Sequence, residues 1–307
     1  MAEGRGKTRR KGGTDLFKIP AYVINMKERS DRWNRFNEQP VISKFRKLRR
    51  IYGVNGKKLN YLTDKHISMQ TKLNIFRNYR RSHYEIATLG AIGASMSHIS
   101  IWKKFVASGA QTCIVFEDDA VITEDQVNKI NELTSSLPSN WGIWILGFYA
   151  PNLVTGPASQ KPWNRVYSFT AAHAYLLRRE AAIKLLQEPF PIQTHIEYYM
   201  TGSSIIKDFS IVQHPDVHIE FFRRVAKPRT QDSNTSQHKK NGCPTCEVSD
   251  DLSQMYRGYS RKGKNGITVN GLVNGQQSNI IRKMRRRTRR VSRNTSAAKR
   301  LMPLSAE

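Results

Sequence analysis

The sequence predicts an α/β fold in which a mixed sheet carries helices on both faces. Short apolar runs that resemble strands alternate with segments of helical periodicity, and this alternation is typical of a helix-covered sheet. One such run, residues 112–116, leads directly into Glu117, Asp118 and Asp119. A strand that ends in acids fits a sheet whose carboxyl edge opens onto a ligand crevice. With 307 residues, the chain is long enough to bury one large core of this kind.

The expected elements follow in a regular order. Five segments have the apolar character of strands, namely residues 21–25, 50–54, 112–116, 143–146 and 172–177. A helix is expected to begin near Ser30 or Asp31, both good N-cap residues. Further helices are expected where apolar residues recur at helical spacing, at 89–106, 127–137 and between 177 and 189.

Charge is unevenly distributed along the chain. The formal net charge is +27, yet residues 19–252 hold 31 basic and 21 acidic side chains, so most of the excess lies toward the two ends. We therefore expect a disordered basic tail at 1–18 and a folded domain at 19–230. Residues 231–307 are first polar and then arginine-rich, which predicts a second, largely disordered tail.

The composition also bears on location. No apolar run reaches membrane-spanning length, and no hydrophobic leader follows the basic start. This predicts a soluble, cytoplasmic protein. The basic tails predict weak attraction to polyanions and peripheral association with acidic membranes.

Two interpretations fit the acid triplet at 117–119. Adjacent carboxylates repel one another, so a cation or a hydrogen-bonding ligand often shares such a cluster. A divalent metal that holds a nucleotide diphosphate would meet this need. Alternatively, the acids form an exposed turn before a helix that Thr123 and Glu124 introduce.

Nucleotide-sugar transfer is a reaction that would require a divalent metal at residues 117–119. The reaction needs a cation for the leaving diphosphate and a base for the acceptor hydroxyl. Asp119 is the main candidate for direct coordination of Mg²⁺ or Mn²⁺, while Glu117 and Asp118 would bind metal, water or ribose. Arg29 and Arg32 follow the first strand, where a nucleotide would sit, although a solvated helix start explains them equally well.

Four sequence blocks, in order and at the usual spacing, resemble those of glycosyltransferase family 25. They are residues 22–32 (YVINMKERSDR), 89–102 (LGAIGASMSHISIW), 114–120 (IVFEDDA) and 173–177 (HAYLL). The family includes lipopolysaccharide-modifying transferases and collagen galactosyltransferases. Several blocks in order are far more specific than one acid triplet. The resemblance covers about residues 19–220.

The resemblance implies a GT-A-like, Rossmann-related fold and a hexosyltransferase that uses a nucleotide-sugar donor, usually UDP-linked. It also implies inversion at the anomeric carbon, with residues 117–119 equivalent to the metal-binding Asp-x-Asp motif. The family often carries an Asp in a segment that matches residues 196–200 (IEYYM), which places Glu197 at that position. Because an inverting transfer is a single displacement, one base suffices, and Glu197 is the candidate.

Other polar residues have weaker assignments. His98, Asn25 and Ser97 are candidates for contact with the donor, although structural roles in caps or core explain each equally well. His214 follows an apolar run and is a candidate third metal ligand, since GT-A enzymes often recruit a late histidine. A loop histidine is its simpler interpretation.

The acceptor is open between a glycan, a lipid-linked glycan and a collagen-like protein. Two other functions also remain open. The arginine-rich tail would bind nucleic acid or another polyanion by counterion release, although it lacks interleaved aromatics for base stacking. A transferase-like fold without activity would instead serve as a scaffold.

Overall fold

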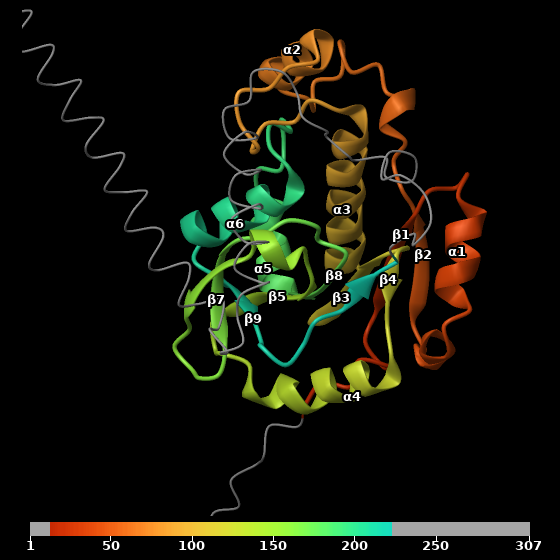
Figure 1. Ribbon diagram of the computed structural model, residues 1–307, viewed down its shortest axis with the longest axis vertical. Coiled ribbons are helices and arrows are strands. Elements are labelled where there is room, and N and C mark those ends of the chain that lie inside the picture. Colours follow the sequence, from red (N-terminus) through yellow and green to blue (C-terminus); the bar gives the residue numbers. More distant parts are fainter. Residues whose placement is uncertain (1–12, 223–307) are drawn as a thin grey trace, which may run out of the picture. The chain divides into compact units, whose positions relative to one another are not determined.

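The computed structural model describes residues 13–222, so most of the tail predicted at 1–18 and all of the tail predicted at 231–307 lie outside this part. Its centre is an eight-stranded sheet in the order β2-β1-β3-β8-β5-β9-β7-β6 (Figure 1). Strands β7 and β8 run antiparallel to their neighbours, and the β1 pairings with β2 and β3 are parallel, as is β5 with β9. The predicted mixed α/β sheet is therefore confirmed.

The strands have the following bounds: β1 Ala21–Asn25, β2 Leu48–Tyr52, β3 Thr112–Glu117, β4 Ala120–Val121, β5 Trp141–Gly147, β6 Val154–Pro157, β7 Asn164–Ser168, β8 Ala174–Arg178, β9 Ser210–Gln213 and β10 Glu220–Phe221. The α-helices are α1 Ser30–Asn37, α2 Met69–Arg77, α3 Leu89–Ala107, α4 Glu124–Leu133, α5 Arg179–Leu185 and α6 Ile196–Ile206. The five predicted strands are all present, each within two residues of its expected start.

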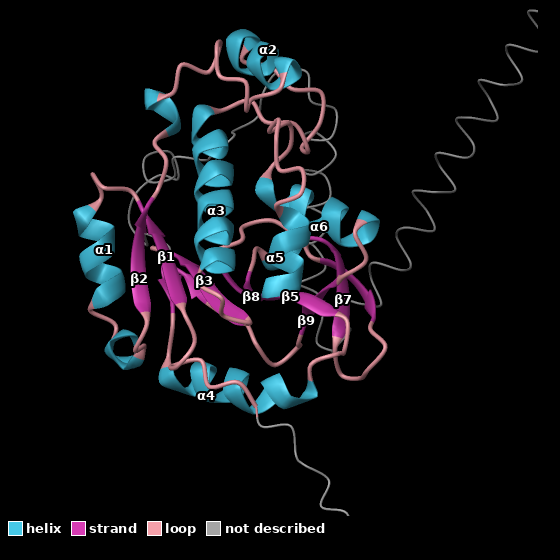
Figure 2. Cartoon of the chain, turned by 180° about the vertical axis from the view of Figure 1, so that it is seen from behind, coloured by secondary structure: helices cyan, strands magenta, loops and turns pink. Residues whose placement is uncertain are grey.

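Helices cover both faces of the sheet, as predicted (Figure 2). One buried cluster joins the sheet to α3, α5 and α6, and it includes Trp102, Leu185 and Met200. The other joins the opposite face to α1 and α4, and it includes Phe36 and Ile130. Alternate side chains of one strand enter the two clusters, because successive residues in a strand point to opposite faces.

Helix α3 crosses the sheet and carries several residues toward the site. Its N-cap residue Thr88 accepts from the backbone N–H of Ala91, which satisfies one donor of the first turn. A side chain at Gly93 would lie 2.3 Å from the carbonyl oxygen of Val54. Only glycine therefore lets the first half of α3 lie against the loop that follows β2.

Helix α1 begins at Ser30, as expected, but Arg29 rather than Ser30 or Asp31 occupies the N-cap position and makes no side-chain cap bond. Helices α2 and α6 and strands β4, β6, β7, β9 and β10 are additions that the sequence pattern does not predict.

Candidate active site

The candidate site lies where β1 and β3 end side by side. These strands are parallel, and Ile24 pairs with Glu117 in their register. Asp118 and Asp119 form the turn between β3 and β4. The carboxyl ends of parallel strands meet at one edge of a sheet, which brings Asn25 to the acids.

Asn25, at the end of β1, links the acid turn after β3 to the middle of β2. Its Nδ2 donates to Asp118 Oδ2 at 2.5 Å and to the Arg29 carbonyl oxygen at 3.0 Å. Its Oδ1 accepts from both the Nε and a terminal nitrogen of Arg50 on β2. The side chain is 1% exposed, so its hydrogen bonds are formed out of water and fix the positions of Asp118 and Arg50.

Arg32 bridges two of the three acids. Its guanidinium forms ion pairs with Asp118 and, at 2.8 Å, with Asp119. Burial nevertheless raises the pKa of Asp118 to about 6, with further repulsion from Asp119 and Glu117. Burial and the charge of Glu117 also raise the pKa of Asp119. The acids therefore lie in a partly desolvated cluster that one arginine does not neutralise.

Glu117 is the third acid, and it faces His98. The His98 Nε2 lies 3.5 Å from Glu117 Oε1. Burial works against the charged form of Glu117, but the contact with His98 outweighs it and lowers the pKa of Glu117. On the other side of the ring, His98 Nδ1 lies 2.9 Å from the Tyr175 hydroxyl, which accepts from Trp102 Nε1 at 3.0 Å.

His173 borders the same acids from the position directly before β8. Its carbonyl oxygen accepts from the Glu117 N–H at 2.8 Å. Its Nε2 lies 2.7 Å from the carbonyl oxygen of Ile219, so Nε2 carries the proton, while the buried Nδ1 has no partner. A Cβ at Gly147 would lie 2.4 Å from this ring, so glycine at the end of β5 makes room for His173.

A short strand pair closes the turn that carries the acids. Strand β10 pairs antiparallel with β4, directly after Asp119. The Phe222 N–H then donates to the Asp119 carbonyl oxygen at 2.8 Å. The acid turn is thus fixed on one side by Asn25 and Arg32 and on the other by β10 and the N–H of Phe222.

Glu197 lies in the first turn of α6, close enough to the acids for the charge of Glu117 to act on it. Its Oε1 accepts from the Ala171 N–H at 2.9 Å. Burial raises the pKa of Glu197, and the charge of Glu117 adds to this effect. Ala171 has φ +65°, a left-handed conformation that costs a non-glycine residue about 1–2 kcal/mol. Such strain is tolerated where it aims a backbone N–H at a particular group.

The structure does not bring every predicted residue to the acids. The Arg29 guanidinium pairs with Asp31. Ser97 donates to the Gly93 carbonyl oxygen and accepts from the Val54 N–H, so it joins α3 to the loop after β2. These bonds favour the structural interpretation of Ser97.

His214 also lies apart. It follows β9, and β8 and β5 lie between β9 and β3 in the sheet. Its ring packs against Trp163, its Nδ1 accepts from the Asp216 N–H, and burial lowers its pKa. These contacts fit the simpler interpretation of a structural loop histidine.

Sequence reasoning missed three contributors: Arg50, His173 and Tyr175. His173 and Tyr175 lie in one block of the sequence, directly before β8 and within it. Their polar side chains in an otherwise apolar block could have marked them as candidates. No local pattern distinguishes Arg50 from the neighbouring basic residues at 46–49.

The donor set fits a divalent cation only in part. Within residues 13–222, no three His, Cys, Asp or Glu side chains are grouped so that they could hold a metal by themselves. Mg²⁺ is commonly bound through one or two carboxylates plus substrate phosphates, and Asp119 and Glu117 can supply these. Asp119 Oδ1 and Arg32 Nε are buried without a hydrogen-bond partner. Unsatisfied buried polar atoms of this kind point to a ligand that completes the site.

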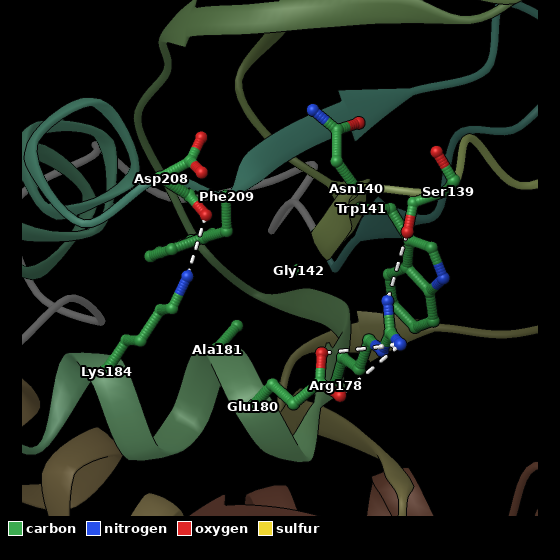
Figure 3. Close-up of a pocket in the computed structure, with 10 residues that line it drawn as sticks. All are labelled: Ser139, Asn140, Trp141, Gly142, Arg178, Glu180, Ala181, Lys184, Asp208 and Phe209. Atoms are coloured by element: carbon green, nitrogen blue, oxygen red, sulfur yellow. Dashed lines mark hydrogen bonds and ion pairs between the residues drawn. The ribbon is translucent and has the colours of Figure 1, made fainter.

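A pocket of about 280 Å³ lies elsewhere, between the start of β5 and the first turns of α5 (Figure 3). Arg178 donates to the Ser139 carbonyl oxygen, and Lys184 Nζ donates to the Asp208 carbonyl oxygen at 2.7 Å. The side chains of Arg178 and Lys184 are therefore hydrogen-bonded to other residues that line the same pocket. None of the candidate site residues lines it.

Comparison with known proteins agrees with the motifs. Residues 18–155 match the family described as glycosyltransferase family 25 (LPS biosynthesis protein). Procollagen galactosyltransferase 1 of Danio rerio is 25% identical over 190 residues, which are 58% of this chain and 30% of that protein. The chain therefore spans less than a third of that relative's length.

Solved structures show only weak likeness. A UDP-glucose pyrophosphorylase complexed with UDP-glucose is 12% identical, with a TM-score of 0.36 over 78% of this chain and 99% of the other. A mannose-1-phosphate geranyltransferase from Thermus thermophilus is 10% identical, with a TM-score of 0.30 over 66% and 59% of the two chains. Neither carries a conclusion. The family match covers a little under half of the chain, and within residues 18–155, which hold Asn25, Arg32 and the three acids, the chain is similar to glycosyltransferase family 25.

Proposed function

We propose that the protein transfers a hexose, such as galactose or glucose, from a UDP-linked donor to a hydroxyl acceptor, with inversion and with Mg²⁺ or Mn²⁺. The observation that best supports this proposal is the acid cluster at the ends of β1 and β3. Asn25 and Arg32 hold this cluster, which retains unsatisfied buried polar atoms. The family match over residues 18–155 supports the same function.

Each residue has a separate task in this proposal. A bound cation would neutralise the leaving diphosphate, with Asp119 and Glu117 as its carboxylate ligands. Arg32 and Asn25 hold Asp118 in place, and His98 orients Glu117. Arg29 remains a proposed contact of the nucleotide. These groups position the donor at the strand ends, where ligands of open α/β sheets bind.

Glu197 is the proposed base. Its carboxylate accepts the proton of the acceptor hydroxyl as that oxygen attacks the anomeric carbon, on the face opposite the departing diphosphate. A pKa raised by burial makes the carboxylate a better proton acceptor near neutral pH. The hydrogen bond from Ala171 holds its orientation.

The acceptor is a glycan, a lipid-linked glycan or a collagen-like protein. The Danio rerio relative is by its name a procollagen galactosyltransferase, which makes a collagen-like hydroxyl one acceptor to test. A screen of such acceptors against UDP-galactose and UDP-glucose would separate the three classes.

The decisive assay measures UDP released from UDP-sugars by the full-length protein, with and without Mn²⁺. Asp119→Asn should reduce metal-dependent turnover by about a hundredfold or more, because it removes a charged ligand at the leaving group. Asp125→Asn, at an exposed acid in the first turn of α4, is the matched control and should have no effect. Absence of both turnover and UDP binding with every common donor would reject the proposal.

Glu197→Gln tests the base separately. It should leave donor binding unchanged and reduce transfer by about 10²–10⁴-fold. Loss of donor binding in this variant would remove Glu197 from the role of base.

A further inference from the structure

Helix α2 exposes its apolar side chains and buries its polar ones. Met69, Leu73 and Phe76 are 69%, 37% and 73% exposed, whereas Thr71 and Asn74 are 1% and 3% exposed. Residues spaced by three and four positions lie on the same side of a helix. The three apolar side chains therefore form one outward stripe, the reverse of the usual arrangement.

Polar contacts explain how the helix is held in this orientation. The Thr71 hydroxyl donates to the Ile192 carbonyl oxygen at 3.2 Å. Asn74 Nδ2 donates to Glu85 at 3.2 Å and to the Ile86 carbonyl oxygen at 3.3 Å. Because the anchoring side is polar, the apolar stripe is not needed for the core.

The stripe belongs to a larger surface, residues 62–84, which we call the α2 face. It holds six of the twelve large hydrophobic side chains that are exposed in the described chain: Leu62, Met69, Leu73, Phe76, Tyr79 and Tyr84. Such a concentration exceeds the scattered apolar residues of an ordinary surface.

Its charge is mostly positive. Lys65 and Arg77 are exposed and Lys72 is partly exposed, whereas the exposed Arg81 is paired with Glu85 and Asp64 is the sole acid between residues 62 and 84. Asp64 is occupied by hydrogen bonds from His66. Phenylalanine, leucine, methionine and tyrosine among lysines and arginines form the composition of surfaces that lie in the headgroup region of anionic bilayers.

We propose that the α2 face docks on a lipid bilayer that carries anionic headgroups, with Met69, Leu73 and Phe76 inserted below them. The surrounding cations match an anionic lipid surface along the whole face, whereas a protein partner would need an acidic rim of matching shape. None of the helices within residues 13–222 is long and apolar enough to cross a bilayer. Docking is therefore proposed parallel to the membrane surface.

The location of α2 gives this contact a consequence for the site. The helix lies in the segment that links the end of β2 to the start of α3, near the N-terminal end of α3 (Figure 1). The acids also follow the carboxyl end of a strand, β3, parallel to β1 and β2. A membrane on the α2 face would hold this edge of the sheet close to its surface.

The test is flotation of the full-length protein with vesicles of phosphatidylcholine mixed with phosphatidylglycerol, compared with phosphatidylcholine alone. We expect binding to the mixed vesicles. In the double variant Met69→Ser and Phe76→Ser, the partition coefficient should fall by about tenfold or more, since two large apolar side chains no longer leave water. Ile206→Ser, at a side chain 82% exposed on α6, is the matched control and should bind like the wild type.

A second, independent variant removes positively charged side chains from the α2 face. Replacing Lys72 and Arg77 by Gln should weaken binding by roughly fivefold per removed charge. Replacing exposed Lys47, just before β2, should have less effect. Thermal unfolding of each variant checks that it folds, and exposed positions make this the expected result.

Electrostatic attraction by the arginine-rich residues beyond 253 must be separated from insertion. Phe76→Cys and Ile206→Cys proteins, with Cys243 and Cys246 replaced by Ser, carry an environment-sensitive fluorophore; the remaining Cys113 is buried. The fluorophore at position 76 should shift to the blue on mixed vesicles, and the one at 206 should not. Binding unchanged in the apolar variant, no shift at position 76, or a wild-type dimer that the apolar variant dissociates would each overturn the proposal.

Discussion

The Tyr175 hydroxyl, 2.9 Å from Nδ1 of His98, determines which nitrogen of that ring carries the proton. Trp102 Nε1 is only a donor, so Tyr175 accepts from it, and its own hydroxyl proton is satisfied when it donates to His98 Nδ1. His98 Nδ1 is then an acceptor, and its proton is on Nε2, which faces Glu117. The donor Trp102 thus determines the direction of the contacts that run through Tyr175 and His98 to Glu117, a candidate metal ligand.

Tyr175→Phe should therefore be costly. It leaves Trp102 Nε1 and His98 Nδ1 buried without partners, and each unsatisfied group costs about 1–3 kcal/mol. We expect the free energy of unfolding to fall by about 2–6 kcal/mol in urea titrations. Tyr167→Phe, at a tyrosine 45% exposed on β7, should change it little; equal losses in both variants would contradict the assigned chain.

Gly147→Ala tests the space given to His173. A Cβ would lie 2.4 Å from the imidazole, and overpacking of this kind costs about 1–3 kcal/mol of unfolding free energy. Gly202→Ala is the control, since nothing lies within 4 Å of its Cβ position in α6. That change should stabilise the protein by up to about 1 kcal/mol, because alanine is the better helix former. If chemical denaturation ranks the two variants in the opposite order, the His173 contact is not as described.

Arg32 and a divalent cation should compete for the same carboxylate oxygens. Arg32→Gln leaves Asp118 and Asp119 without their guanidinium, which should cost about 3 kcal/mol in the absence of metal. Added Mn²⁺ should then raise the thermal midpoint more in this variant than in the wild type.

Arg29→Gln supplies the contrast for that experiment. The Arg29 guanidinium pairs with Asp31, two residues along the chain. The rise in thermal midpoint that Mn²⁺ causes in Arg29→Gln should therefore equal that of the wild type. Midpoint shifts of the same size in wild type and Arg32→Gln would argue against competition.

His195 should make stability fall as the solution is acidified. Burial, with Arg80 and His83 nearby, lowers the pKa of His195 from 6.5 to about 4. The unfolded chain binds the proton more readily, so the stabilising contribution is present above pH 6.5 and is lost as the pH falls toward 4. Between pH 7 and 5 the loss should be about 2 kcal/mol. Urea titrations at the two pH values should show a smaller difference for His195→Gln than for the wild type.

Much of the acid edge was predictable because its determinants are contiguous. The apolar strand that leads directly into Glu117 can be recognised from the sequence alone. Asn25 is the last residue of the neighbouring strand, and Arg32 follows it by seven residues. Parallel pairing of β1 with β3 then brings them together. Local sequence was sufficient here because each strand ends at its functional residue.

Contacts that depend on strand order were not predictable. Tyr175 meets Trp102 across 73 residues because β8 inserts antiparallel between β3 and β5. The same order separates His214 from the acids. Helix α2 was missed for a different reason: its apolar stripe faces outward, so a pattern that assumes apolar residues face the core does not apply to it.

The pairing of β10 with β4 sets a lower limit on how far the protein can be shortened. The N–H of Phe222 is bonded to the backbone of Asp119, and the carbonyl of Ile219 holds His173. A fragment cut at residue 155, where the family match stops, or anywhere before 222, would release the acid turn from its backbone support. Trimmed versions made for crystallisation or assay should therefore retain every residue through Phe222.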